Sequence, residues 1–203
     1  LDGDGHSIIN LNISSDITNA GLFSILKGGS IKNLKITGNI KAAANAGLFA
    51  GKLENSVISD CAAIGNVEVS SANAGAIAGI NGGTIENSLS AGLYVKAAAN
   101  AGGIAGSITG GITDGITDSG IIKNCISAAE QVTADMYAGS IAGINSGSVT
   151  SCVGANLLID SPLTYTSGRI TTNKDGGTTR KNYIYEDSKA SSLNMNSDKD
   201  DIN

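Results

Sequence analysis

The chain has 203 residues, with 28 Gly, no Trp and 2 Phe, and only 15% of its residues are charged. Its 41% hydrophobic content is too high for a disordered chain, and the few aromatic residues indicate a core of small aliphatic side chains. The net charge of −5 and the lack of a basic patch argue against nucleic-acid binding. Three cysteines are too few for a disulfide scaffold, and no apolar stretch approaches the ~20 residues that span a membrane.

The chain begins at Leu1 without a charged and apolar leader, so we expect a mature or trimmed piece of a longer protein with flanking domains. An imperfect repeat dominates it. The dipeptide Ala-Gly opens five similar blocks, at Ala20, Ala46, Ala74, Ala101 and Ala138, spaced by 26, 28, 27 and 37 residues. The last spacing has about ten extra residues, which predicts a loop inserted at residues 109–120.

A second element follows each opener and closes on Gly38, Gly65, Gly92, Ala129 and Asn156. Seven positions earlier is the β-branched column Ile31, Ile58, Ile85, Ile122 and Val149. Five positions earlier is the polar column Asn33, Asp60, Asn87, Asn124 and Ser151, where we expect the chain to bend, because Asn and Asp tolerate left-handed conformations. Two positions after these closing residues, which serve as the anchor of the alignment, is the column Ile40, Val67, Tyr94, Gln131 and Leu158. The N-terminal segment is expected in the same frame, with Ile8, Asn10, Leu11 and Ile17 in matching columns.

The apolar runs last three to six residues and are rich in β-branched side chains, which favours short strands over helices. A period near 27, with about three strands per repeat, suits a coil of three faces whose strands pair with those of the next coil. We therefore predict an all-β fold: a single right-handed parallel β-helix of about six coils over residues 1–161. Residues 162–203 are predicted to form a non-repeating C-terminal cap and polar tail, with a hairpin loop around Gly176 and Gly177 and a last strand at Tyr183–Tyr185.

The repeats resemble the GLUG-motif repeats of bacterial surface proteins. The resemblance rests on AGLFAG (46–51), AGAIAG (74–79), the NGG turn (81–83) and the opening LDGDGHSIINLNI (1–13), and it covers residues 1 to about 160. Proteins with such repeats are typically large secreted or cell-surface proteins; some are adhesin-like, and some carry immunoglobulin-cleaving metallopeptidase domains elsewhere. This chain departs from the family pattern, because it has Ala or Ser in the segment where the family often has Gly-Leu-Val-Gly.

No catalytic constellation is evident. His6 has no HExxH context and is expected to hold a turn in the first coil. Cys61, Cys125 and Cys152 share one column four positions before the anchor, and we predict three buried free thiols, because the coil spacing exceeds the Cβ separation that a disulfide needs.

Asp114 and Asp118, in the duplication GITDGITD, are weak calcium candidates, since neither an EF-hand loop nor a GGxGxD repeat is present. The acidic residues Glu54, Asp60, Glu68 and Glu86 occupy different columns among Lys32, Lys52 and Lys123, which favours a solvated face over a glycosidase pair. No column is rich in Thr, as ice binding would require. No cofactor or metal is expected.

The sequence leaves three functions open. The first is a non-catalytic bacterial repeat module, extracellular or on the cell surface, that acts as an adhesin-like domain or a stalk and binds an unknown protein or glycan. The second is a carbohydrate-binding or polysaccharide-active β-helix, disfavoured by the missing Trp although Tyr94, Tyr137 and Tyr165 remain. The third is an accessory segment of a secreted metallopeptidase. No nucleic-acid partner and no membrane insertion of this segment are expected.

Overall fold

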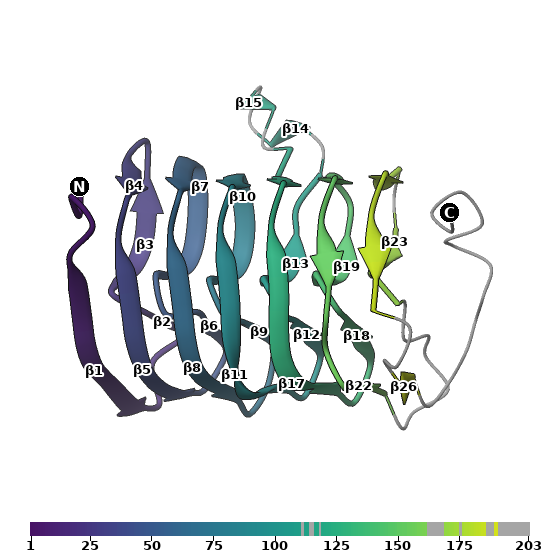
Figure 1. Ribbon diagram of the computed structural model, residues 1–203, viewed down its shortest axis with the longest axis horizontal. Coiled ribbons are helices and arrows are strands. Elements are labelled where there is room, and N and C mark those ends of the chain that lie inside the picture. The colour runs from purple at the N-terminus through teal and green to yellow at the C-terminus, as the bar shows by residue number, and fades with distance from the viewer. Residues whose placement is uncertain are drawn as a thin grey trace.

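The computed structural model describes residues 1–110, 112–113, 116–117, 119–161, 169–174, 176–185 and 189–190. All regular elements in these ranges are β-strands, and they stack as a solenoid of about six coils along one axis (Figure 1). Strand pairing is parallel throughout the stack, so the predicted parallel β-helix is confirmed. No helix of the described residues is long and apolar enough to cross a membrane.

Three sheets run along the axis. The long sheet contains β1 (Ser7–Ser15), β5 (Lys35–Ala42), β8 (Ala62–Val69), β11 (Leu89–Ala97), β17 (Ile126–Ala134), β21 (Val153–Gly154), β22 (Leu158–Asp160), β25 (Tyr183–Ile184) and β26 (Lys189–Ala190). The split sheet contains β3 (Phe23–Lys27), β4 (Ser30–Lys32), β7 (Ala50–Ser59), β10 (Ala78–Glu86), β13 (Ala105–Ile108), β16 (Ile121–Lys123), β19 (Ala142–Asn145), β20 (Ser148–Thr150), β23 (Thr171–Asn173) and β24 (Thr178–Arg180). The short sheet contains β2 (Asn19–Ala20), β6 (Asn45–Ala46), β9 (Asn73–Gly75), β12 (Asn100–Gly102) and β18 (Tyr137–Gly139).

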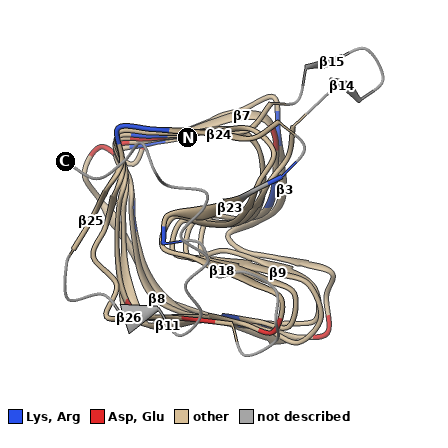
Figure 2. Cartoon of the chain, turned by 90° about the vertical axis from the view of Figure 1, so that its right-hand side faces the viewer, with Lys and Arg blue, Asp and Glu red and all other residues tan. Residues whose placement is uncertain are grey.

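Two short strands of the fourth opener block lie outside this stack. β14 (Ile112–Thr113) and β15 (Ile116–Thr117) pair antiparallel with one another, away from the three sheets (Figures 1 and 2). An insertion of this kind is tolerated because it leaves from one corner of a coil, and the strands on either side, β13 and β16, keep their places in the split sheet.

The core is a set of stacked columns. The β-branched column of the split sheet pairs in register from Ile31 to Val149, and all five side chains are fully buried. The opener alanines form a second buried column in the short sheet, from Ala20 to Ala138. Both columns are as the repeat alignment predicts, because in-register parallel stacking brings equivalent residues of successive coils together.

Viewed along the axis, the coils superpose in one outline, which is indented between β18 and β23 (Figure 2). The openers form this indentation and approach the long sheet from inside. A Cβ atom on Gly103 would lie 1.8 Å from the Ser127 hydroxyl of the long sheet, and one on Gly154 would lie 1.9 Å from the Ser140 hydroxyl. Glycine is therefore required at these two positions because a serine side chain lies directly opposite.

The corner between the split sheet and the long sheet is built by left-handed residues. Asn33, Asp60, Asn87, Asn124 and Ser151 have φ angles of 53°, 54°, 50°, 54° and 55°. The bend predicted at this column is confirmed, and its conformation explains the preference for Asn and Asp. The column extends in both directions beyond the predicted repeats, to Asp4 (φ 47°) and Lys181 (φ 54°).

The structure corrects the predicted frame of the first coil. Ile8 pairs with Ile36 rather than joining the Ile31 column, and Ile13, not Ile17, pairs with Ile40. The reason is that the first corner lies at Asp4, whereas Asn10 (φ 59°) belongs to a register shift between Ile8 and Leu11. The resemblance of Asn10-Leu11 to Asn33-Leu34 therefore misled the alignment.

A second correction concerns the column that includes Tyr94. Val67 pairs with Val95, because β11 carries a β-bulge between Ala91 and Val95. Tyr94, Gln131 and Leu158 then form a column one place out of phase with Ile40 and Val67. The buried residues of that region are Val95, Val132 and Ile159.

The described part of residues 162–203 continues the ladders. β23 pairs with β19, β24 with β20, β25 with β21 and β26 with β22, all in parallel. The turn at Gly176 (φ 86°) exists, but the hairpin prediction is wrong, because the strands on either side pair with the preceding coil and not with one another. A strand at Tyr183–Ile184 is confirmed. The domain boundary at residue 161 stays a prediction, since residues 162–168 lie outside the described part.

Candidate ligand-binding groove

His6 lies at the exposed turn that begins the first coil. Its Nδ1 is 2.9 Å from the Gly3 carbonyl oxygen, and its backbone N–H donates to the same oxygen at 2.7 Å. The His6 carbonyl in turn accepts a hydrogen bond from Lys35 of the second coil. These contacts fit the predicted structural role, because they fix the turn against β5.

The three cysteines are buried in one column and none is in a disulfide. Each thiol donates to the carbonyl two residues earlier, at 3.1 Å for Cys61, 3.3 Å for Cys125 and 3.3 Å for Cys152. Burial raises the pKa of the Cys61 thiol, and the hydrogen-bonded Cys152 thiol together with burial raises that of Cys125. The hydrogen bond with Cys125 lowers the pKa of the Cys152 thiol. Thiols with raised pKa values are poor nucleophiles at neutral pH, and the burial of all three side chains makes this column part of the core.

Three of the four candidate carboxylates, Glu54, Glu68 and Glu86, pair with lysines, whereas Asp60 has no lysine partner among the described residues. Glu54 lies 2.7 Å from Lys52 and 3.3 Å from Lys27, and the hydrogen bond from Lys52 is the main reason that its pKa lies below the usual range. Lys123 bridges to Glu86 at 2.7 Å, one coil away. Lys41 bridges to Glu68 at 3.5 Å, also one coil away. These three acids therefore form ion pairs with lysines on the outer faces of the solenoid. They do not form the pair of neighbouring carboxyl groups that a glycosidase uses as acid and base.

Asp114 and Asp118, the calcium candidates, lie outside the described residues. Within the part of the chain that the structure describes, no three His, Cys, Asp or Glu side chains gather closely enough to hold a metal ion.

Of the three tyrosines considered for stacking, Tyr94 and Tyr137 are half-buried and Tyr165 lies outside the described residues. The structure instead exposes Tyr183 and Tyr185, at 56% and 54%. They are two residues apart and so face the same side of the chain, with Tyr183 in β25 and Tyr185 just after it. The alternation Tyr-Ile-Tyr was the available signal, because the central Ile184 packs against the core.

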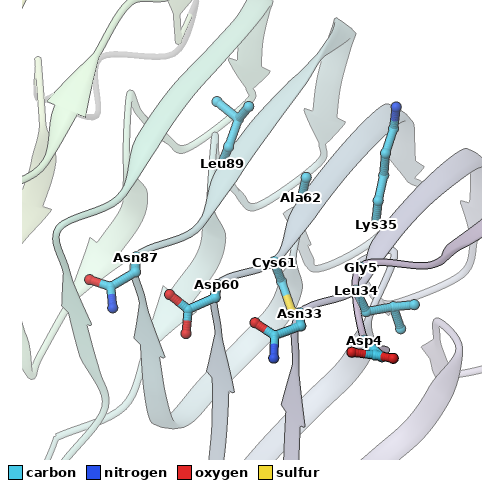
Figure 3. A pocket seen from close by; sticks show the side chains of 10 residues that line it. All are labelled: Asp4, Gly5, Asn33, Leu34, Lys35, Asp60, Cys61, Ala62, Asn87 and Leu89. Atoms are coloured by element: carbon cyan, nitrogen blue, oxygen red, sulfur yellow. The ribbon is translucent and has the colours of Figure 1, made fainter. Parts of the chain in front are cut away.

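A hollow of about 480 Å³ runs along the left-handed corner (Figure 3). We call it the corner groove. It is lined by Asp4, Gly5, Asn33, Leu34, Lys35, Asp60, Cys61, Ala62, Asn87 and Leu89, which come from successive coils. Two rows face it. Figure 3 shows Asn33, Asp60 and Asn87 side by side in one row, with Lys35, Ala62 and Leu89 in the other.

The second row is the start of an outer column of the long sheet. Register pairs connect Lys35, Ala62, Leu89, Ile126, Val153 and Tyr183. Beyond Lys35 every member is apolar or aromatic, and Ile126 is 45% exposed. The corner groove therefore has hydrogen-bonding groups along one wall and apolar surface along the other, an arrangement suited to binding rather than to acid–base chemistry.

The polar row retains free hydrogen-bonding capacity. Asn124 donates to the Asn87 side-chain oxygen at 3.2 Å, and Asn33 donates to Asp2 at 3.1 Å. The Asp60 carboxylate accepts no hydrogen bond from the residues that the structure describes. By contrast, a half-buried ladder in the short sheet, from Asn19 to Asn100, bonds amide to amide at every step. That ladder is structural, whereas the corner row presents its groups to solvent.

Comparison with known proteins gives the fold. No protein-family model matches the chain, and no curated protein matches it. Among solved structures it is similar to the crystal structure of a candidate immunoglobulin A1 protease from Bacteroides ovatus, with 23% identity and a TM-score of 0.71. The match covers 93% of this chain and 60% of that one, so the chain spans about three fifths of that structure's length. The class of protein is therefore a parallel β-solenoid, and this likeness shows the fold alone.

Proposed function

We propose that this chain is a non-catalytic repeat module of a secreted or cell-surface bacterial protein. It would act as a rod that spaces neighbouring domains and binds a protein or glycan through its outer faces. The observation that carries the proposal is the engagement of the reactive groups in the solenoid itself: the thiols are buried against carbonyls, and Glu54 and Glu86 pair with lysines. The bacterial and secreted context is supported by the GLUG-like repeats and by the Bacteroides ovatus neighbour.

A second candidate is an accessory segment of a secreted peptidase. It is favoured by the name of the structural neighbour, a candidate immunoglobulin A1 protease, of whose length the match covers 60%. As an accessory segment this chain would bind the immunoglobulin substrate without cleaving it, so the two candidates differ in partner and not in chemistry.

The direct experiment incubates the purified chain with human immunoglobulin A1 and follows the heavy chain on a denaturing gel. We expect no cleavage after a day at 37 °C. Appearance of heavy-chain fragments that the metal chelator EDTA suppresses would overturn the non-catalytic assignment.

A binding experiment then separates the rod from the accessory segment. Immobilised immunoglobulin A1, mucin and serum albumin are each titrated with the chain by surface plasmon resonance. Saturable binding to mucin alone supports an adhesin-like role, and saturable binding to immunoglobulin A1 supports the accessory role. Binding to none of the surfaces leaves the spacer role, which predicts a rod-like particle in small-angle X-ray scattering.

A further inference from the structure

We propose that the corner groove binds a linear, uncharged polysaccharide laid parallel to the solenoid axis, one sugar residue per coil. This inference deepens the proposed surface function by naming the ligand class, and it rests on that function. It uses the polar row, from Asn33 to Asn87, and the apolar outer column that runs from Ala62 to Tyr183.

The spacing of the groove selects the ligand. Equivalent groups recur once per coil, about 4.8 Å apart, because neighbouring strands of a sheet have that separation. An extended peptide advances about 3.3 Å per residue, so its side chains on one face recur at about 6.6 Å and lose phase with the coils. The advance per sugar in a linear pyranose chain is close to the coil spacing, so successive sugars stay beside both walls.

The two walls match the two kinds of surface on a sugar ring. Asp60 and the amides of Asn33 and Asn87 offer donors and acceptors for hydroxyl groups. Ala62 and Leu89 offer apolar surface to the ring C–H groups on the opposite wall. Further along the same column Ile126 and the exposed Tyr183 ring extend this surface, and an aromatic face packs well against a sugar ring.

The charges of the groove disfavour an anionic polymer. Asp4 and Asp60 face it, and Lys35 is the only cation among its lining residues. A uronic-acid chain would place a carboxylate in every coil, and those in the coils of Asp4 and Asp60 would be repelled by the protein carboxylates. Neutral sugars carry no such cost.

Glycine substitutions remove the polar wall without straining the backbone. Asn33, Asp60 and Asn87 all have left-handed φ angles, which glycine adopts freely. The test variant is therefore Asn33→Gly/Asp60→Gly/Asn87→Gly. Leu89→Asp breaks the apolar wall independently, at a side chain that is only half-buried. The matched control is Thr84→Ala, in β10 of the split sheet and outside the groove lining.

The chain is first screened on an array of neutral linear glycans of at least six sugars. Cellohexaose, a hexagalacturonate and an array hit are then titrated by calorimetry. We expect a neutral glycan to bind at least tenfold more tightly than the hexagalacturonate. The triple glycine variant and Leu89→Asp should each weaken binding at least tenfold, while Thr84→Ala leaves it unchanged.

Three results would overturn the proposal: no array signal, a preference for the uronate, or unchanged affinity in both groove variants. Circular dichroism confirms that each variant keeps its β-sheet signal, and Leu89→Asp decides the matter if the triple variant unfolds. Binding of an extended peptide in place of glycans would assign the groove to a protein partner. Failure of the groove proposal is distinguishable from failure of the proposed surface function. If only the groove proposal fails, the unmodified chain still binds mucin or immunoglobulin, and the groove variants bind it equally well.

Discussion

The interior of the solenoid differs between its N-terminal and C-terminal coils, although the backbone ladders are the same. In the third coil the opener residue Leu48 and the long-sheet residue Ala63 occupy the positions that Gly103 and Ser127 occupy two coils later. In the sixth coil the same positions hold Ser140 and Gly154. The contents of the indentation therefore shrink along the axis from an apolar pair to glycine and serine.

The buried serines are integrated by hydrogen bonds. Ser140 donates to the Asn156 side-chain oxygen, and Asn156 donates to the Ser127 hydroxyl at 3.1 Å and to the Ala129 carbonyl at 2.7 Å. All three side chains are fully buried. Backbone pairing therefore sets the outline of every coil. The interior volume of each coil depends on which two side chains, one from the opener and one from the long sheet, face one another there.

The largest effect is expected where the apolar interior is emptied. Leu48→Ala removes a fully buried side chain and should lower the free energy of unfolding by about 2–5 kcal/mol. Urea denaturation followed by circular dichroism measures it. The control Val57→Ala, at a side chain 37% exposed, should change stability by less than about 0.5 kcal/mol. Equal effects of the two substitutions would contradict the apolar packing of the third coil.

The C-terminal coils should respond in the opposite way, to added volume. Gly103→Ser adds a Cβ that would lie 1.8 Å from the Ser127 hydroxyl and 2.2 Å from the Ser140 carbonyl oxygen, and overpacking of this kind costs about 1–3 kcal/mol. Adding Ser127→Gly recreates the Ser140–Gly154 pair of the next coil and should recover part of the loss, because it removes the side-chain clash and leaves the one with the carbonyl. A double-mutant cycle measures the coupling, and purely additive effects would show that the two residues do not face one another.

Substitutions at the left-handed corner should change stability by the same amount in the N-terminal and the C-terminal coils. Asn33→Ala and Asn124→Ala should each cost about 1–2 kcal/mol, because alanine is strained at positive φ. Asn33→Gly and Asn124→Gly should cost markedly less than the alanine variants. Equal stability of the alanine and glycine variants, measured by thermal unfolding, would argue against left-handed corners.

The smallest effect concerns pH and the first coil. Hydrogen bonds from the Asp4 backbone and from Asn33 and Lys32 lower the pKa of Asp2 from 3.8 to about 2. Because the folded state favours the ionised form, the stabilisation is fully present above about pH 4 and is lost as the pH falls toward 2. Asp2→Asn should therefore be less stable than the native chain at pH 6, and the difference should shrink as the pH falls through about 2. A constant difference across that range would contradict the assignment, and 1 M salt should reduce the effect at pH 6.

The repeat alignment predicts the core columns and the left-handed corner because identical residues stack in register. The column from Ile31 to Val149 and the cysteine column could be predicted once the period of the repeat was known. The first coil was misplaced because Asn10 resembles a corner residue while the corner lies at Asp4. The strands β23, β24 and β26 were not predicted, because Thr171, Thr179 and Lys189 stand where the preceding coil has Ala142, Val149 and Leu158.

The corner groove could not be read from the sequence, because it is made by two columns that meet only once the corner is folded. Asp60 and Leu89 are 29 residues apart and belong to different coils, yet both line the same hollow. A β-bulge such as the one in β11 moves every later side chain of the strand by one place. The residue types of Leu93 and Tyr94 do not indicate a bulge at this position. That Tyr183 continues the apolar column of the groove could not be predicted either, because its place in the column is defined by pairing with Val153.

The most direct test of the account is the spacing of equivalent residues along the axis. Lys32, Lys123, Thr150 and Arg180 lie in one outer column of the split sheet, with Lys123 three coils, Thr150 four and Arg180 five coils from Lys32. Spin labels can be placed there after Cys61, Cys125 and Cys152 are changed to Ser, the residue that the same column already holds at Ser88. Electron–electron resonance should give mean distances that rise from Lys32 by about 4.8 Å per coil, with underlying backbone separations of about 14, 19 and 24 Å. Distances that do not increase in this order would contradict the stacked solenoid, and with it the groove.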